Sequence, residues 1–122
     1  MIIGIGNDII EIKRVEKAIL KEGFKNKVYT QKELENIEKR GNRTETYAGI
    51  FSAKEAISKA IGTGVREFSL ANLEILNNDL GKPYVVVSEK LDKILKNKKE
   101  DYQIEISISH SRKYATAMAI IF

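Results

Sequence analysis

FSAKEAISKAIG, at residues 51–62, is the stretch that predicts the central helix of this chain. Its apolar side chains recur at helical spacing, and its alanines are small enough for close packing. Glu55, Ser58 and Lys59 are three and four residues apart, so one helical face is expected to hold all three. A buried helix with an ordinary Glu55–Lys59 surface pair would show the same pattern. The rest of the chain is therefore needed to choose between a structural and a functional interpretation.

The boundaries of this helix are marked by threonines and glycines. Thr44 or Thr46 is expected to open the helix, and Ile61 is expected to be its last residue. Gly62 and Gly64 follow, where glycine commonly ends a helix. Glycines also let the backbone approach a bulky ligand closely.

The N-terminal segment predicts a strand followed by a helix. Residues 1–6 are an apolar run, which predicts a buried strand that ends at Asp8. Residues 9–21 carry apolar side chains at helical spacing and a basic opposite face, and Gly23 is expected to close this helix. Asp8 has two interpretations: an N-cap for the helix, or a carboxylate that a ligand can reach at the rim of a sheet.

The remaining elements predict an α+β fold. Thr30 and Glu33 have the spacing of a capping box for a helix over 31–40, which Gly41 and Asn42 would break. Strands are expected over 69–76, 84–87, 104–109 and 114–122, with a helix from Ser88 to about residue 97. The last two strands alternate and should pair, with an alanine face toward a helix. We expect a single domain over 1–122, with helices gathered on an antiparallel sheet.

Composition narrows the classes of function. The 122 residues carry a net charge of +4, which suits an anionic partner. Without cysteine there is no disulfide, thiolate nucleophile or cysteine metal site. No apolar run approaches the roughly 20 residues that span a bilayer, and the N-terminus does not fit a signal peptide, so a cytoplasmic location is expected. Glycine-rich loops of common nucleotide folds and a nucleic-acid-binding signature are both missing from the sequence.

A few side chains could carry chemistry. Asp8 and Glu55 together could hold Mg2+, which prefers oxygen ligands and commonly takes one or two carboxylates. Lys59 could bind phosphate or exchange a proton, and His110, the only histidine, ends an alternating strand. Each also has a structural interpretation, as a helix cap, a solvated helix face or a structural histidine. The segment GKP at 81–83 is either a turn or part of a ligand wall.

Four motifs occur in an order that points to one family. They are GNDIIEIKR at 6–14, FSAKEAISKAIGTG at 51–64, GKP at 81–83 and ISHSRKYATAMAI at 108–120. With these motifs the chain resembles, over essentially its whole length, the holo-[acyl-carrier-protein] synthases, which are short trimeric 4′-phosphopantetheinyl transferases. The resemblance implies transfer of the phosphopantetheine arm of coenzyme A to a serine of apo acyl carrier protein. 3′,5′-ADP would leave, and the product would serve fatty acid biosynthesis.

The resemblance also implies roles for individual residues. Asp8 and Glu55 match the magnesium ligands, and Lys59 matches a lysine that touches phosphate and protonates the leaving group. Glu55 and a water on the metal are the two candidates for the base that activates the carrier serine. The residues expected to contact coenzyme A are Lys59, Gly62, Gly64, Pro83, His110 and Ser111.

Arg14 matches a residue that meets the acidic carrier protein, and Lys17 and Lys21 would extend its basic patch. Members of the family often have a basic residue just before the Phe of FSAKE, and here Ile50 takes that position. Arg40 or Arg43 could compensate. The family pattern further implies a homotrimer with each site between neighbouring subunits.

Two other classes of function fit the basic helix at 9–21. A non-catalytic module would use this helix to dock an acidic protein, with Asp8 as a cap and Glu55 paired with Lys59. A nucleic-acid-binding protein would use the same basic face, and its binding would weaken steeply with salt. The enzyme hypothesis alone requires Asp8 and Glu55 to lie close enough to share an ion.

Overall fold

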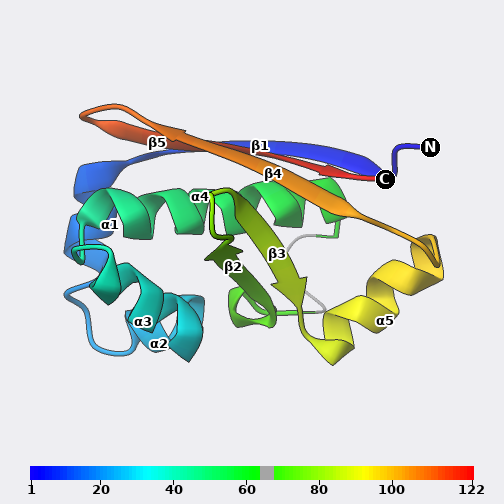
Figure 1. The fold of residues 1–122 in the computed structure, drawn as a ribbon, viewed down its shortest axis with the longest axis horizontal. Coiled ribbons are helices and arrows are strands. Elements are labelled where there is room, and N and C mark those ends of the chain that lie inside the picture. The colour runs from blue at the N-terminus through cyan, green and yellow to red at the C-terminus, as the bar shows by residue number, and fades with distance from the viewer. Residues whose placement is uncertain (64–67) are drawn as a thin grey trace.

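The computed structural model describes residues 1–63 and 68–122, and its central element is one long helix, α4 (Figure 1). The helices are α1 (Ile12–Ala18), α2 (Phe24–Val28), α3 (Gln31–Lys39), α4 (Thr44–Ile61) and α5 (Glu89–Lys98), with a 3-10 turn at Leu70–Asn72. The strands are β1 (Gly4–Glu11), β2 (Leu73–Asn77), β3 (Pro83–Val87), β4 (Ile104–His110) and β5 (Tyr114–Ile121).

The strands form two antiparallel sheets on different sides of α4. One sheet has the order β1-β5-β4, and the other is the hairpin of β2 and β3. Figure 1 shows the three-stranded sheet lying along one side of α4, with β2, β3 and α3 on the other side. This arrangement confirms the predicted α+β class, with helices packed on antiparallel strands. In the described part of the chain, no helix is long and apolar enough to cross a membrane.

The three-stranded sheet approaches α4 closely because the facing residues are small. A Cβ atom built on Gly4 would lie 1.8 Å from the Ala60 carbonyl oxygen, and one on Gly6 would lie 1.9 Å from that of Ala56. On the neighbouring strand β5, the alanines expected to face a helix are almost completely buried; they are Ala115, Ala117 and Ala119. The backbones of β1 and α4 are therefore in direct contact.

The N-terminal segment differs from the prediction. β1 continues to Glu11 because all eight of its residues pair with β5, so Asp8 lies within the strand and not at its end. The strand is also not buried on both faces: Ile5 and Ile9 are 62% and 67% exposed, because α4 covers only the inner face. The interpretation of Asp8 as an N-cap is wrong, since Glu11 holds that position without a side-chain cap.

The first helix is shorter than expected. α1 begins at Ile12, three residues later than predicted, and ends at Ala18. Gly23 does not close it; this glycine has φ +83° and precedes α2, a short helix that the sequence pattern did not reveal. Similarly, the strand expected over 69–76 begins with the 3-10 turn and becomes extended only at Leu73.

Local capping signals predicted the other boundaries well. Thr30 and Glu33 form the expected capping box at the start of α3. α4 spans Thr44–Ile61 and ends at Gly62, which has φ +88°. Ser88 caps α5 by accepting a hydrogen bond from the Leu91 amide. β4 and β5 form the predicted hairpin.

The contact between β1 and α4 predicts a large cost for Gly6→Ala. The added methyl group would overlap the Ala56 carbonyl, so the strand must move away from the helix. We expect a loss of about 3 kcal/mol or more in the free energy of unfolding, measured by urea denaturation.

Gly81→Ala is the matched control for this substitution. Gly81 has φ +88° but nothing within 4 Å of its built Cβ atom, so only backbone strain of about 1–2 kcal/mol is expected. Equal losses for the two variants would contradict a tight contact at Gly6.

Candidate functional site

Asp8 is held on the inner face of β1 by two residues of α4. Ser52 Oγ donates a hydrogen bond to Asp8 Oδ2 at 3.0 Å. Lys59 Nζ lies 3.3 Å from Asp8 Oδ1 and also donates to the Asn7 carbonyl at 2.9 Å. Because Ser52 is fully buried and the Asp8 side chain is only 16% exposed, the carboxylate has a defined position.

Glu55 lies near Asp8 and feels its charge. Partial burial raises the pKa of Glu55, the neighbouring Asp8 carboxylate raises it further, and Lys59 lowers it. A carboxylate whose ionised form is disfavoured beside a second carboxylate is a donor that a divalent cation would stabilise. Among the described residues there is no group of three or more potential metal-ligating side chains. Two carboxylates are nevertheless enough for Mg2+, which commonly completes its shell with water and substrate phosphates.

The structure does not contain the Glu55–Lys59 surface pair that a purely structural interpretation of α4 predicts. Lys59 forms its ion pair with Asp8 and not with Glu55. Ser58, expected on the same face as Glu55 and Lys59, is buried and donates its hydroxyl hydrogen bond to the Lys54 carbonyl at 3.0 Å. Asp8 therefore acts on both side chains of α4: it pairs with Lys59, and its charge raises the pKa of Glu55. Ser52, a residue with no predicted role, also binds Asp8.

Asp8 and Glu55 line one cleft of about 360 Å3, between β1, α1 and α4. Arg14, an exposed residue of α1, lines the same cleft, together with the apolar rings of Phe24 and Phe51. The cleft is therefore lined by one basic side chain, Arg14, and two acidic ones, Asp8 and Glu55.

Two further lysines predicted to extend the basic patch lie outside the lining of this cleft. Lys17 and Lys21 are exposed, as the sequence pattern predicts for a basic face. Their exposure leaves them open to a partner.

His110 and Pro83 line a second cleft, of about 200 Å3. It contains Arg40 and Arg43 as well, and Arg40 Nη1 donates to Asn77 Oδ1 at 2.5 Å. Ile50, which takes the position where the family that the chain resembles often has a basic residue, is buried and lines this cleft. Arg40 and Arg43 line the same cleft and could supply that positive charge.

The predicted site residues are therefore divided between two clefts within one chain. The two clefts share no lining residue: Asp8 and Glu55 belong to one, and Pro83 and His110 to the other. Ser111 follows His110 in an exposed turn, where its Oγ accepts a hydrogen bond from the Tyr114 amide. Gly62 ends α4 beyond Lys59, and Gly64 lies outside the described residues.

Residues 4–119 match the sequence profile of the 4′-phosphopantetheinyl transferase superfamily. The chain belongs to this superfamily. It is 92% identical over 121 residues to a holo-[acyl-carrier-protein] synthase of Fusobacterium nucleatum subsp. nucleatum, covering 99% of each chain. The resemblance derived from the four motifs is therefore confirmed.

Solved structures of family members have the same fold. The holo-[acyl-carrier-protein] synthase of Neisseria meningitidis superposes with a TM-score of 0.90 at 32% identity, covering 100% of this chain and 99% of that one. The enzyme of Bacillus anthracis, solved in complex with CoA (3′,5′-ADP), gives a TM-score of 0.80 at 38% identity, covering 99% and 96%.

The electrostatics of the carboxylate pair predict that Glu55→Gln stabilises the metal-free protein. Partial burial, and after it the Asp8 charge, raise the folded-state pKa of Glu55, so stability is lost as the pH rises through that pKa and the side chain ionises. A neutral glutamine avoids this loss. Thermal unfolding in EDTA should therefore show a higher midpoint for Glu55→Gln at pH 7, by a few degrees, and no difference below the ordinary glutamate pKa.

Glu16→Gln, at an exposed position of α1, is the control and should change the midpoint less. A Glu55→Gln protein that melts below wild type at pH 7 would show that Glu55 is favourably paired and would contradict the carboxylate cluster.

Proposed function

We propose that this chain transfers the 4′-phosphopantetheine arm of coenzyme A to a serine of apo acyl carrier protein. The observation that carries the proposal is the meeting of Asp8 and Glu55 at one cleft, in a chain of the phosphopantetheinyl transferase superfamily. The carrier serine oxygen would attack the phosphorus that bears the pantetheine arm. The bond from that phosphorus to the bridging pyrophosphate oxygen would break, releasing 3′,5′-ADP. The product would serve fatty acid biosynthesis.

Asp8 and Glu55 are proposed to hold Mg2+. Both carboxylates line the open cleft, and burial together with the Asp8 charge disfavours the ionised form of Glu55, which a bound divalent cation would stabilise. Bound Mg2+ would neutralise negative charge on the coenzyme A pyrophosphate and on the leaving phosphate. Ser52 would keep the Asp8 carboxylate in its orientation through the hydrogen bond to Oδ2.

Lys59 is proposed to contact the phosphates and to supply a proton to the leaving group. Its ammonium group lies at Asp8 and its side chain is 56% exposed, so it can reach a ligand in front of the carboxylates. In the absence of a ligand the same ammonium group compensates the charge of Asp8.

Arg14, Lys17 and Lys21 are proposed to bind the acidic carrier protein. All three are exposed on α1 or just after it, and Arg14 lines the cleft that contains the two carboxylates. An acidic carrier helix docked on this patch would bring its serine toward Asp8 and Glu55. Charge complementarity of this kind mainly increases the association rate and sets specificity.

The second cleft is proposed to bind the adenosine end of coenzyme A. His110, Pro83 and Ser111 would contact this end, and Gly62, which ends α4 just after Lys59, would contact the part of coenzyme A near Lys59. Arg40 and Arg43 line the same cleft as Ile50, so they are the candidates to supply the positive charge that Ile50 lacks.

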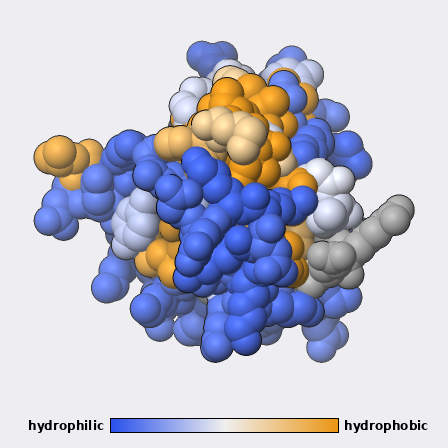
Figure 2. Space-filling view, turned by 90° about the vertical axis from the view of Figure 1, so that its right-hand side faces the viewer, coloured by the Kyte–Doolittle hydropathy of each residue, from blue (hydrophilic) through white to orange (hydrophobic). Residues whose placement is uncertain are grey.

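A homotrimer would bring the two clefts together from neighbouring copies. The outer face of the β1-β5-β4 sheet offers a surface for this contact, with Ile5, Ile9 and Met118 each more than half exposed. Figure 2 shows apolar atoms gathered at the level of this sheet, above a mostly hydrophilic surface. Contiguous exposed apolar surface commonly marks an interface between subunits. A cytoplasmic location remains a prediction.

The decisive test of the activity is intact-mass spectrometry of apo acyl carrier protein incubated with this chain, coenzyme A and Mg2+. We expect the carrier to gain the mass of one phosphopantetheine arm, and EDTA should abolish the gain. Asp8→Asn and Glu55→Gln should each reduce the rate by roughly 100-fold or more, because a charged ligand of the metal is lost.

Glu16→Gln serves as the control variant in the same assay and should transfer at the wild-type rate. Near-normal transfer by purified Asp8→Asn would contradict the assigned metal site. No transfer to any of several carriers by folded wild-type protein would overturn the activity and favour a binding module.

A further inference from the structure

A buried lysine, Lys54, lies in the middle of α4 beside the site residue Glu55. Its side chain has no exposed surface. The ammonium group donates to the Val28 carbonyl at 2.6 Å and to Glu33 Oε1 at 2.6 Å. It also lies 5.7 Å from the centre of the Tyr29 ring. Lys54 therefore joins α4 to the end of α2 and to the first turn of α3.

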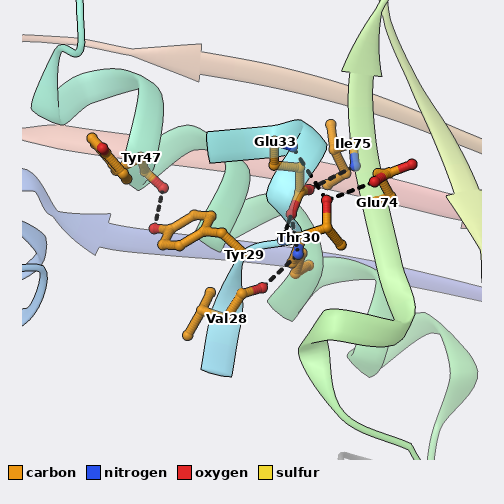
Figure 3. Close-up of polar contacts among 8 residues, drawn as sticks. Val28, Tyr29, Thr30, Glu33, Tyr47, Glu74 and Ile75 are labelled. Carbon is orange, nitrogen blue, oxygen red and sulfur yellow. Dashed lines mark hydrogen bonds and ion pairs between the residues drawn. The ribbon is translucent and has the colours of Figure 1, made fainter. Parts of the chain in front are cut away.

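Glu33, its partner, is equally buried and extends the connection to the second sheet (Figure 3). Glu33 Oε1 accepts from the Thr30 amide at 2.8 Å, and Oε2 accepts from the Ile75 amide of β2 at 2.7 Å. Thr30 adds a further link, since its hydroxyl donates to Glu74 Oε2 at 2.6 Å. The hydrogen bonds of Lys54 and Glu33 thus connect α4 with α2, α3 and β2.

A pair of this kind is not an efficient source of stability. Removing two charges from water is expensive, and replacing a buried pair by neutral side chains often leaves stability unchanged or improves it. Burial raises the pKa of Glu33 and lowers that of Lys54, while their mutual attraction opposes both shifts. Such a pair does, however, demand one geometry, because any displacement leaves a buried charge without its partner.

The geometry that the Lys54–Glu33 pair requires fixes the side of α4 on which Glu55 lies. Successive residues of a helix point about 100° apart, so Lys54 holds α4 on the α3 side while Glu55 faces the cleft with Asp8. A rotation of α4 by about 20° would move a carboxylate near the helix surface by about 2 Å. Mg2+ requires oxygen ligands at close to 2.0–2.1 Å in octahedral geometry. The helix must therefore be fixed about its own axis for Glu55 and Asp8 to share an ion.

We infer that the Lys54–Glu33 pair positions Glu55 for metal binding, by fixing the rotation of α4 against α3 and β2. This inference rests on the proposed function, because it assumes that Asp8 and Glu55 hold the cation. Lys54 touches neither substrate nor metal in this scheme and acts only through the helix. The contact of Gly4 and Gly6 with the opposite side of α4 fixes the other ligand, Asp8, in the same way.

The test is a Lys54→Met/Glu33→Gln double variant, which removes both charges and keeps a hydrogen-bonding side chain at position 33. Binding of Mn2+, used as the probe for Mg2+, is measured on the full chain by electron paramagnetic resonance of free Mn2+. We expect roughly 10–100-fold weaker binding than in wild type, as for other residues that orient metal ligands. In the transfer assay kcat should fall, while KM for the carrier protein should stay unchanged.

Leu95→Ala provides a control for a general loss of stability. Leu95 is fully buried in α5 and lines neither of the two clefts, so its truncation should lower the unfolding temperature without weakening Mn2+ binding. If the double variant binds Mn2+ as tightly as Leu95→Ala does, the pair has no positioning role.

Two further outcomes separate this inference from its premise. Wild-type protein that binds no Mn2+ either alone or with coenzyme A present would overturn the proposed metal site itself. If the double variant does not fold, the single variant Glu33→Gln is measured, and wild-type Mn2+ affinity in that variant would overturn the inference. Failure of both variants to fold would also overturn it, because the pair would then be required for the fold and not for the direction of one side chain.

Discussion

The contact between the backbones of β1 and α4 is the constraint on which the rest of the structure depends. Gly4 and Gly6 let the strand lie directly on the helix, at a distance where any side chain would overlap the carbonyls of Ala60 and Ala56. Since Asp8 follows Gly6 by two residues, it points to the same face of the strand and meets Ser52 and Lys59. The position of the Asp8 carboxylate is thus a direct consequence of the glycines at positions 4 and 6.

The helix α4 carries charged groups in two environments that differ in solvent exposure. In the cleft, partial burial and the nearby Asp8 charge both raise the pKa of Glu55. In the interior, Lys54 and Glu33 attract each other, but burial removes the hydration that stabilises both charges in water. Neither arrangement is one that stability alone would select. Departures from favourable electrostatics are expected where a fold has to present reactive groups in a set geometry.

Local signals predicted most of the fold, and its tertiary features explain the errors. The capping box at Thr30, the glycine at 62 and the alternation over 104–109 act within a few residues, and each prediction was confirmed. β1 was misjudged because its pattern is inverted: glycines and Asp8 face the helix, whereas Ile5 and Ile9 face outward. The sequence contained one overlooked signal, since Lys54 falls on the apolar stripe of α4 between Ile50 and Ile57.

The candidate site was predicted in part. The motifs identified Asp8, Glu55 and Lys59, and the fold brings these three together. The support from Ser52 depends on how β1 crosses α4, and the separation of His110 from Glu55 depends on the tertiary arrangement of two clefts. Neither has a signature in the linear sequence. The roles proposed for His110, Pro83 and Arg43 depend further on a second copy of the chain.

The most direct measurement is anomalous diffraction from crystals grown with coenzyme A and MnCl2. The proposed site predicts one manganese peak per chain, bound by Asp8 and Glu55 and by the coenzyme A pyrophosphate. The adenosine end should lie against Pro83 and His110 of a neighbouring copy in a trimer. Manganese bound away from both carboxylates, or coenzyme A held entirely within one chain and away from them, would contradict the proposed site.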